Sequence, residues 1–147
     1  MAAADNKALI TAIFDDLARG DSRRFAAALH PDFAWVVTGS SSWSGRHGGG
    51  LRAVSEAFLK PLNSRLSQAI RTTPSRISAD GGVVIVEGKG AGVTTEGAPY
   101  ENDYCLIYVF KDGQIAEQIE YMDSAYCEAV LGKWDDVLAA YKAGDVA

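Results

Sequence analysis

The sequence predicts an α+β domain in which N-terminal helices pack on a curved, mostly antiparallel sheet. Helical periodicity of apolar residues dominates residues 5–61, whereas residues 66–122 are rich in β-branched and aromatic side chains. Short turn signals such as Asp112-Gly113 divide the second region, which favours sequential antiparallel strands. With 147 residues, 48% of them hydrophobic, the chain 1–147 is expected to form one domain with one core. A sheet curved around helices leaves a cone with an open mouth, the usual place for a small-molecule pocket.

Two helices are predicted before the first strand. Residues 5–21 place their apolar side chains on one stripe, with Asp5 as the expected N-cap and Gly20 as the stop. Residues 21–31 repeat this pattern over a shorter span, and Pro31 is expected to end it.

The remaining helices are expected over residues 51–61, over 125–132 and, as an extra C-terminal helix, over about 134–143. Pro61 is expected to close the first of them, and Asp123 or Ser124 to cap the second. The core of the domain is then expected over about residues 6–131.

Strands are predicted over residues 32–39, 66–79, 82–95, 100–110 and 114–122, with residues 40–50 as a loop. The last four strands follow one another through short turns and therefore predict an antiparallel meander. The glycine-rich stretch GKGAG in the strand predicted over residues 82–95 lacks the spacing and setting of a nucleotide-binding loop, so a flexible or bulged strand is expected there.

Composition and charge exclude several classes of function. The net charge is -5 and no cluster of Lys or Arg is present, which argues against nucleic acid as a partner. The chain has no basic segment followed by a long apolar stretch and no run of about 18 apolar residues, so no membrane association and a cytoplasmic location are expected. Cys105 and Cys127 are expected to be reduced and buried. Two histidines without CxxC or HExxH give no metal-binding motif, and no cofactor is expected.

The order of these elements resembles a known family. The chain resembles the SnoaL-like group of the nuclear transport factor 2-like superfamily. The resemblance lies in the order of a helix pair, FAWVVTG, SWSGRHGG, a helix ending at Phe58 and then ENDYCLIYVFKDGQIAEQIEYMDSA. The resemblance covers about residues 6–131 and implies a cone-shaped fold, a cystatin-like roll, and frequent homodimers. The superfamily includes polyketide cyclases, steroid isomerases, epoxide hydrolases and non-catalytic adaptors, so the fold alone assigns no chemistry.

Glu120 is the candidate catalytic residue. Strand alternation places Gln118, Glu120 and Met122 on one face, and the resemblance puts Glu120 where the cyclases carry an inward Asp used as acid/base. In the epoxide hydrolases of the superfamily, the carboxylate at this position has an Arg and an Asp as partners on an earlier strand. The corresponding stretch of this chain is roughly EGKGA, which lacks such a pair. The isomerases' Tyr and Asp donors fall at Phe14 and approximately Leu106, so neither of those chemistries is expected.

The predicted reaction is cofactor-independent proton transfer beside a carbonyl of a small hydrophobic substrate, as in a cyclase, isomerase or lyase. Burial among aromatic rings would raise the pKa of Glu120 toward neutrality, and Asn102, Tyr104 or His47 would donate a hydrogen bond to the developing oxyanion. The expected substrate-binding residues are Trp35, Trp43, His47, Asn102, Tyr104, Tyr108, Gln118 and Met122.

Each of these residues also has a purely structural interpretation. In that interpretation Glu120 is a surface carboxylate on an edge strand, His47 is a solvated loop residue, and Asp123 is a helix N-cap. The alternative for the whole protein is a non-catalytic ligand-binding or dimeric interaction domain whose cone is filled by its own side chains. A homodimer through the outer face of the sheet is predicted from the apolar residues Cys105, Ile107, Val109, Ile119 and Tyr121.

Overall fold

A computed structural model describes residues 2–146. Its helices are α1 (Ala3–Ala18), α2 (Arg23–Ala28), α3 (Leu51–Val54), a π-helical turn (Ser55–Leu59), α4 (Lys60–Asn63), α5 (Ser124–Leu131) and α6 (Trp134–Val146). Its strands are β1 (Leu29–Val37), β2 (Gly45–His47), β3 (Leu66–Asp80), β4 (Val83–Thr94), β5 (Pro99–Lys111) and β6 (Gln114–Met122).

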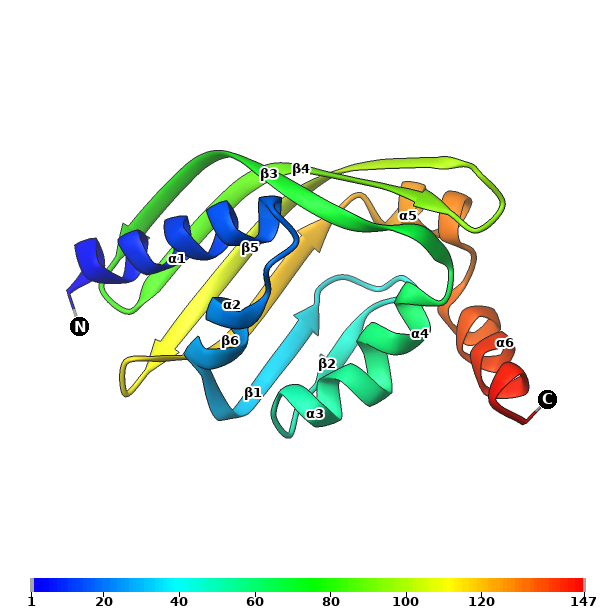
Figure 1. The fold of residues 1–147 in the computed structure, drawn as a ribbon, viewed down its shortest axis with the longest axis horizontal. Coiled ribbons are helices and arrows are strands. Elements are labelled where there is room, and N and C mark those ends of the chain that lie inside the picture. Colours follow the sequence, from blue (N-terminus) through cyan, green and yellow to red (C-terminus); the bar gives the residue numbers. More distant parts are fainter. Residues whose placement is uncertain (1, 147) are drawn as a thin grey trace.

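The strands form one sheet in the order β2-β1-β6-β5-β4-β3 (Figure 1). The neighbours are antiparallel except for β1 and β6, which run parallel, and β3 to β6 form the predicted meander. Helix α1 packs against β3 and β4, α3 packs against β1, and α6 packs against α4. The predicted α+β class, with helices on a curved and mostly antiparallel sheet and a further helix at the C-terminus, is confirmed.

The two ends of α1 differ in how well the sequence predicted them. The helix begins at Ala3 after Ala2, so the prediction of Asp5 as N-cap is wrong, and its carboxylate lies in the first turn instead. That position is still favourable for an acid, because the N-terminal end of a helix carries partial positive charge. Gly20 has a φ of 77° and ends the helical region as expected.

The segment after α2 becomes extended earlier than predicted. Helix α2 ends at Ala28, and Leu29, which is buried, already pairs with Ile115 of β6. Pro31 therefore lies inside β1 and does not end a helix. The ladder between β1 and β6 is irregular between Leu29 and Ala34, and Pro31 can occupy this stretch because no regular ladder requires its missing N–H.

Residues 40–50 and the following helix also depart from the prediction. Part of the expected loop forms β2, which pairs antiparallel with β1. The helix predicted to close at Pro61 continues to Asn63 through the π-helical turn, in which the Lys60 N–H bonds to the Ser55 carbonyl five residues earlier. The wider turn tolerates Pro61, which lacks an N–H and would crowd a regular α-helix.

Strands β3 and β4 pair irregularly and approach their neighbours closely. Register shifts interrupt their pairing, one of them between Pro74 and Arg76. Gly90 lies in the glycine-rich stretch, where a Cβ would come within 2.5 Å of the Tyr104 ring. The missing side chain thus lets the Tyr104 ring lie directly on β4.

The C-terminal region begins with the predicted cap. The Asp123 carboxylate accepts a hydrogen bond of 3.1 Å from the Tyr126 backbone N–H, so its interpretation as the N-cap of α5 is confirmed. Cys127 of α5 is buried, Cys105 is half-buried, and both are free thiols. Within residues 2–146, none of the helices combines the length and apolar character needed to cross a membrane.

Candidate active site

A cavity of about 580 Å³ lies between the inner face of the sheet and the helices that cover it. Aromatic and aliphatic side chains from β1, β5, β6, α1 and the α3–α4 helix form most of its wall. Seven of the predicted site residues line it, namely Trp35, Trp43, Tyr104, Tyr108, Gln118, Glu120 and Met122. Asn102 and His47 are not among the lining residues.

Glu120 faces this cavity from the centre of the sheet. It lies on β6 between Leu106 of β5 and Val37 of β1, and only 8% of its surface is exposed. The inward face of β6 is the one that strand alternation predicts for this position. Its diagonal neighbours on the same face are Tyr104, Tyr108 and Trp35.

The Glu120 carboxyl group has no protein partner. Among residues 2–146, no hydrogen bond or ion pair reaches its side chain. Burial raises its pKa from the ordinary value of 4.5 to about 7, because the charged form loses solvation by water. The Trp35 indole opposes this rise, although its buried Nε1–H does not reach hydrogen-bond geometry with the carboxyl or with any other described group. The site therefore contains an acid that exchanges its proton near neutral pH.

A chain of polar groups ends at the Tyr104 hydroxyl. The Asn102 amide donates to the Tyr100 oxygen at 2.8 Å, and the Tyr100 and Tyr104 oxygens lie 2.7 Å apart. Either phenol can donate in this contact, and the Tyr100 hydroxyl also lies 3.9 Å from the Met122 sulfur. When Tyr100 donates to Tyr104, the Tyr104 proton is free to be donated into the cavity. Burial raises the pKa of both phenols, which stay protonated at neutral pH.

Asn102 supports this chain from outside the cavity. Its amide also donates to the Asp123 carbonyl at 3.0 Å, and its oxygen accepts from the Asp123 N–H at 3.3 Å. All of its strong hydrogen-bonding groups are thus used within the protein. Asn102 orients Tyr100 and does not face a ligand directly.

Two further polar side chains on the floor of the cavity have no hydrogen-bond partner among residues 2–146. Tyr108 is 2% exposed and Gln118 is 3% exposed, and they lie opposite each other on β5 and β6. Burial raises the pKa of Tyr108 and keeps its phenol protonated. A bound molecule with oxygen atoms would satisfy these groups together with Glu120.

His47 and Trp43 belong to an aromatic cluster beside the cavity. The His47 ring stacks on Phe58 at a centroid distance of 4.7 Å, and Trp134 of α6 packs on the same phenyl ring. Burial lowers the pKa of His47, which favours the neutral imidazole. Trp43 lines the cavity, but its indole N–H already donates to the Gly132 carbonyl at 2.8 Å. Trp43 is thus a fixed part of the wall, whereas His47 stacks on the cavity-lining Phe58 and does not line the cavity itself.

Sequence reasoning missed several residues of this site. Tyr100 shares the strand parity of Tyr104 and was detectable from alternation alone. Phe58 and Arg71 line the cavity from a helix and from β3. The apolar periodicity of residues 51–61 places Phe58 on a buried helical face, but no pattern in the sequence marked either residue as part of a ligand site. In the described part of the chain, no group of three or more His, Cys, Asp or Glu side chains is placed to hold a metal ion.

Comparison with solved structures shows the same fold in proteins of low sequence identity. A nuclear transport factor 2-like protein of unknown function from Burkholderia pseudomallei is 19% identical, with a TM-score of 0.73 over 86% of this chain and 96% of that one. A protein described as a SnoaL-like polyketide cyclase, from Jannaschia sp., is 14% identical, with a TM-score of 0.71 over 89% and 94%. A protein of unknown function with a cystatin-like fold from Xanthomonas campestris is 20% identical, with a TM-score of 0.72 over 90% and 99%.

The sequence itself matches a family model. No curated protein matches the chain. The model of the SnoaL-like domain matches residues 10–118, most of the chain, and ends two residues before Glu120. The chain belongs to the SnoaL-like domain family.

Proposed function

We propose that the protein is a cofactor-independent enzyme that moves a proton at a carbon beside a carbonyl group of a small hydrophobic substrate. One observation carries this proposal: a buried carboxyl group without a protein partner, Glu120, faces an aromatic cavity and has a pKa of about 7. A general acid/base works best when its pKa is near the operating pH. Glu120 is therefore suited to take a proton and return it.

The proposed step is a proton abstraction. The Glu120 carboxylate takes a proton from the carbon next to the carbonyl, and the electron pair of that C–H bond moves into an enolate. The Tyr104 hydroxyl, held by Tyr100 and Asn102, donates a hydrogen bond to the enolate oxygen. Glu120 then returns its proton to another carbon, which gives isomerisation. Alternatively, the enolate carbon attacks a second carbonyl carbon of the same molecule, and the C=O π electrons become an alkoxide that takes the proton from Glu120, which gives cyclisation.

Hydrogen–deuterium exchange at an activated carbon tests this proposal without knowledge of the natural substrate. The probe is 2-tetralone, an aromatic ketone with acidic hydrogens beside its carbonyl, followed by NMR in D₂O. Glu120→Gln should lower the protein-catalysed exchange rate by about 10²- to 10⁴-fold, the usual contribution of a general base. Tyr104→Phe should lower it less, since one of several donors is removed.

Glu117→Gln is the matched control for this experiment. Glu117 lies on the same strand, is half-buried, and bonds to Arg46 on the outer side of the sheet, so its replacement should leave the exchange rate unchanged. Equal rates for the Glu120→Gln variant and the wild type would contradict the proposal. Binding of 2-tetralone without any exchange above the solvent rate would support the alternative, a non-catalytic ligand-binding domain. The open cavity already argues against a cone filled by its own side chains.

We infer in addition that the protein forms a homodimer through the outer face of the sheet. Ile107 and Ile119 are half-buried there without a helix to cover them, and Tyr121 beside them is 49% exposed. An apolar face of this kind favours contact with another protein surface. Sedimentation should show a dimer for the wild type and a monomer for Ile119→Glu. A monomer for both at micromolar concentration would contradict the inference.

A further inference from the structure

Only two charged side chains line the cavity among residues 2–146. Glu120 lies on its floor, and the second is Arg71, on β3. Arg71 is exposed to solvent, so its guanidinium lies at the mouth of the cavity. The cavity thus combines an acid in its interior with a permanent positive charge at its entrance, and the step proposed for Glu120 gives Arg71 no role.

The Arg71 guanidinium has most of its hydrogen-bonding capacity free. No ion pair is formed by Arg71 in the described chain, and its one hydrogen bond is a long contact of 3.4 Å to the Ala18 carbonyl at the end of α1. A guanidinium offers five N–H donors, and two of them match the two oxygens of a carboxylate. Gly20 keeps this position open, because a Cβ there would lie 3.0 Å from a terminal nitrogen of Arg71.

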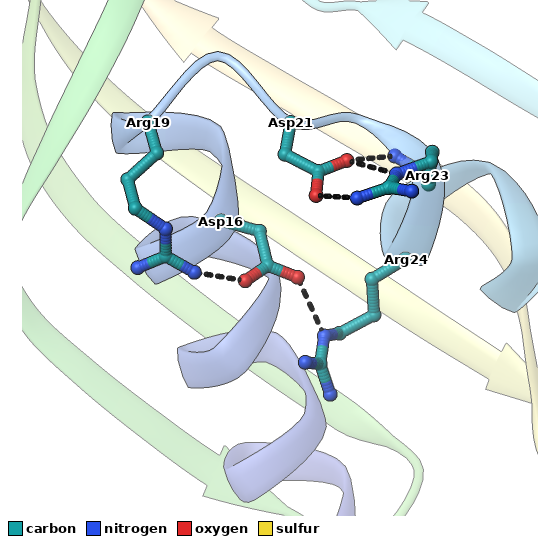
Figure 2. A network of polar contacts seen from close by, with 5 residues as sticks. All are labelled: Asp16, Arg19, Asp21, Arg23 and Arg24. Carbon is teal, nitrogen blue, oxygen red and sulfur yellow. Dashed lines mark hydrogen bonds and ion pairs between the residues drawn. The ribbon is translucent and has the colours of Figure 1, made fainter.

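The acids of the adjacent α1–α2 corner are already neutralised (Figure 2). Asp16 bonds to Arg19 at 2.5 Å and to Arg24 at 2.7 Å, and Asp21 bonds to Arg23 at 2.8 Å. Other residues of this corner, such as Gly20 and Ser22, line the cavity, so these pairs lie close to the mouth. The three arginines and two aspartates of these pairs together carry one net positive charge, although the whole chain has a net charge of -5.

The two charged groups of the cavity are well separated. Arg71 pairs with Ala91, which pairs with Glu101 on β5, whereas Glu120 pairs with Leu106 on the same strand. Positions 101 and 106 are five residues apart, which corresponds to about 17 Å along an extended strand. Arg71 is also not among the groups that shift the pKa of Glu120. A molecule that reaches both groups has to be elongated.

We infer that Arg71 binds an anionic group of the substrate, and that the substrate is an elongated hydrophobic molecule with a carboxylate or a similar anionic oxygen group at its outer end. The assignment of a carbonyl group to the inner end of this molecule depends on the function proposed for Glu120, whereas the assignment of an anionic group to its outer end depends on Arg71 alone. Arg71 is in this view a specificity-determining residue that selects acidic molecules over their neutral counterparts.

Two fluorescent probes test the anionic end independently of catalysis. The dye 8-anilino-1-naphthalenesulfonate and N-phenyl-1-naphthylamine share one aromatic body and differ in a sulfonate group. In the wild type the two probes should compete for one site, with the sulfonate bound more tightly. Arg71→Gln should weaken binding of the sulfonate about tenfold, as expected for loss of one charge-assisted contact, and leave the neutral probe unchanged.

Three further variants make the result specific. Arg76→Gln is the matched control on the same strand, because Arg76 already bonds to Glu87 and does not line the cavity. Arg71→Lys should retain part of the preference for the sulfonate. The preference for the sulfonate over the neutral probe should persist in Glu120→Gln, so a failed exchange experiment with this preference intact would reject the proposed catalysis and leave this inference standing. Unchanged sulfonate affinity in Arg71→Gln, an equal loss for both probes, or no preference for the sulfonate in the wild type would overturn it.

Discussion

The buried carboxyl of Glu120 makes the stability of the protein depend on pH in a predictable way. Its pKa is about 7 in the folded protein and 4.5 when the carboxyl is exposed to water. Between these values the folded state binds a proton that the unfolded state releases, so the free energy of unfolding falls as pH rises from about 4.5 to about 7. This difference in pKa lowers the free energy of unfolding by about 3 kcal/mol, at about 1.4 kcal/mol per pKa unit. Above pH 7 the stability has fallen by this full amount.

Glu120→Gln removes this loss because the amide is neutral at every pH. The variant should be about 3 kcal/mol more stable than the wild type at pH 8, and the two should agree within about 1 kcal/mol at pH 4. Urea unfolding followed by circular dichroism from pH 4 to 9 measures the difference, and groups that titrate equally in both proteins cancel. Glu117→Gln is the control and should show no such trend. A difference between Glu120→Gln and the wild type that stays constant across this range would refute the reasoning.

Further predictions concern the reaction, the core and the support of Tyr104. The rate of 2-tetralone exchange should rise with pH and be half-maximal near pH 7, because the ionised Glu120 is the base; a rate that falls through this range, measured by NMR, would contradict that role. Phe33→Ala should lower the free energy of unfolding by about 3 to 5 kcal/mol in urea titrations, since the ring is fully buried. Asn102→Ala should cost about 1 to 3 kcal/mol, because its bonds to Tyr100 and Asp123 are lost, and should slow exchange by less than Tyr104→Phe does.

The parts of the fold that could be predicted are those governed by short-range patterns. The alternation of residues 117–122 is regular, so it places Glu120 and Gln118 on the inner face, although a register shift between Ile115 and Glu117 interrupts it earlier in the strand. Strong turn signals fix the meander. The errors lie where tertiary contacts override local signals. Pro31 looks like the end of a helix but lies in β1, since burial of Leu29 against Ile115 extends the chain earlier.

The cavity wall was less predictable because it depends on long-range packing. Asn102 has the same strand parity as Tyr104, yet its neighbours at Asp123 and Tyr100 use its amide completely. His47 lies in a glycine-bounded segment, but the stacking of its ring on Phe58 follows from how β2 meets the π-helical turn. Arg71 carried no signal, since only the three-dimensional structure brings the bend of β3 next to the end of α1.

The distribution of satisfied and unsatisfied polar groups separates structure from function in this protein. Many polar groups are bonded within the protein, such as the Asp16 carboxylate with its two arginines and the Trp43 indole with Gly132, whereas among the described residues the Asn6 side-chain oxygen is buried without a partner away from the cavity. Those that face the cavity or border it, the Glu120 carboxyl and the Trp35 indole N–H, have no partner among the described residues. A buried polar group without a partner destabilises the folded state by about 1 to 3 kcal/mol. The fold would be more stable with apolar residues at these positions, so their chemistry is best explained by a bound molecule that supplies the missing hydrogen bonds.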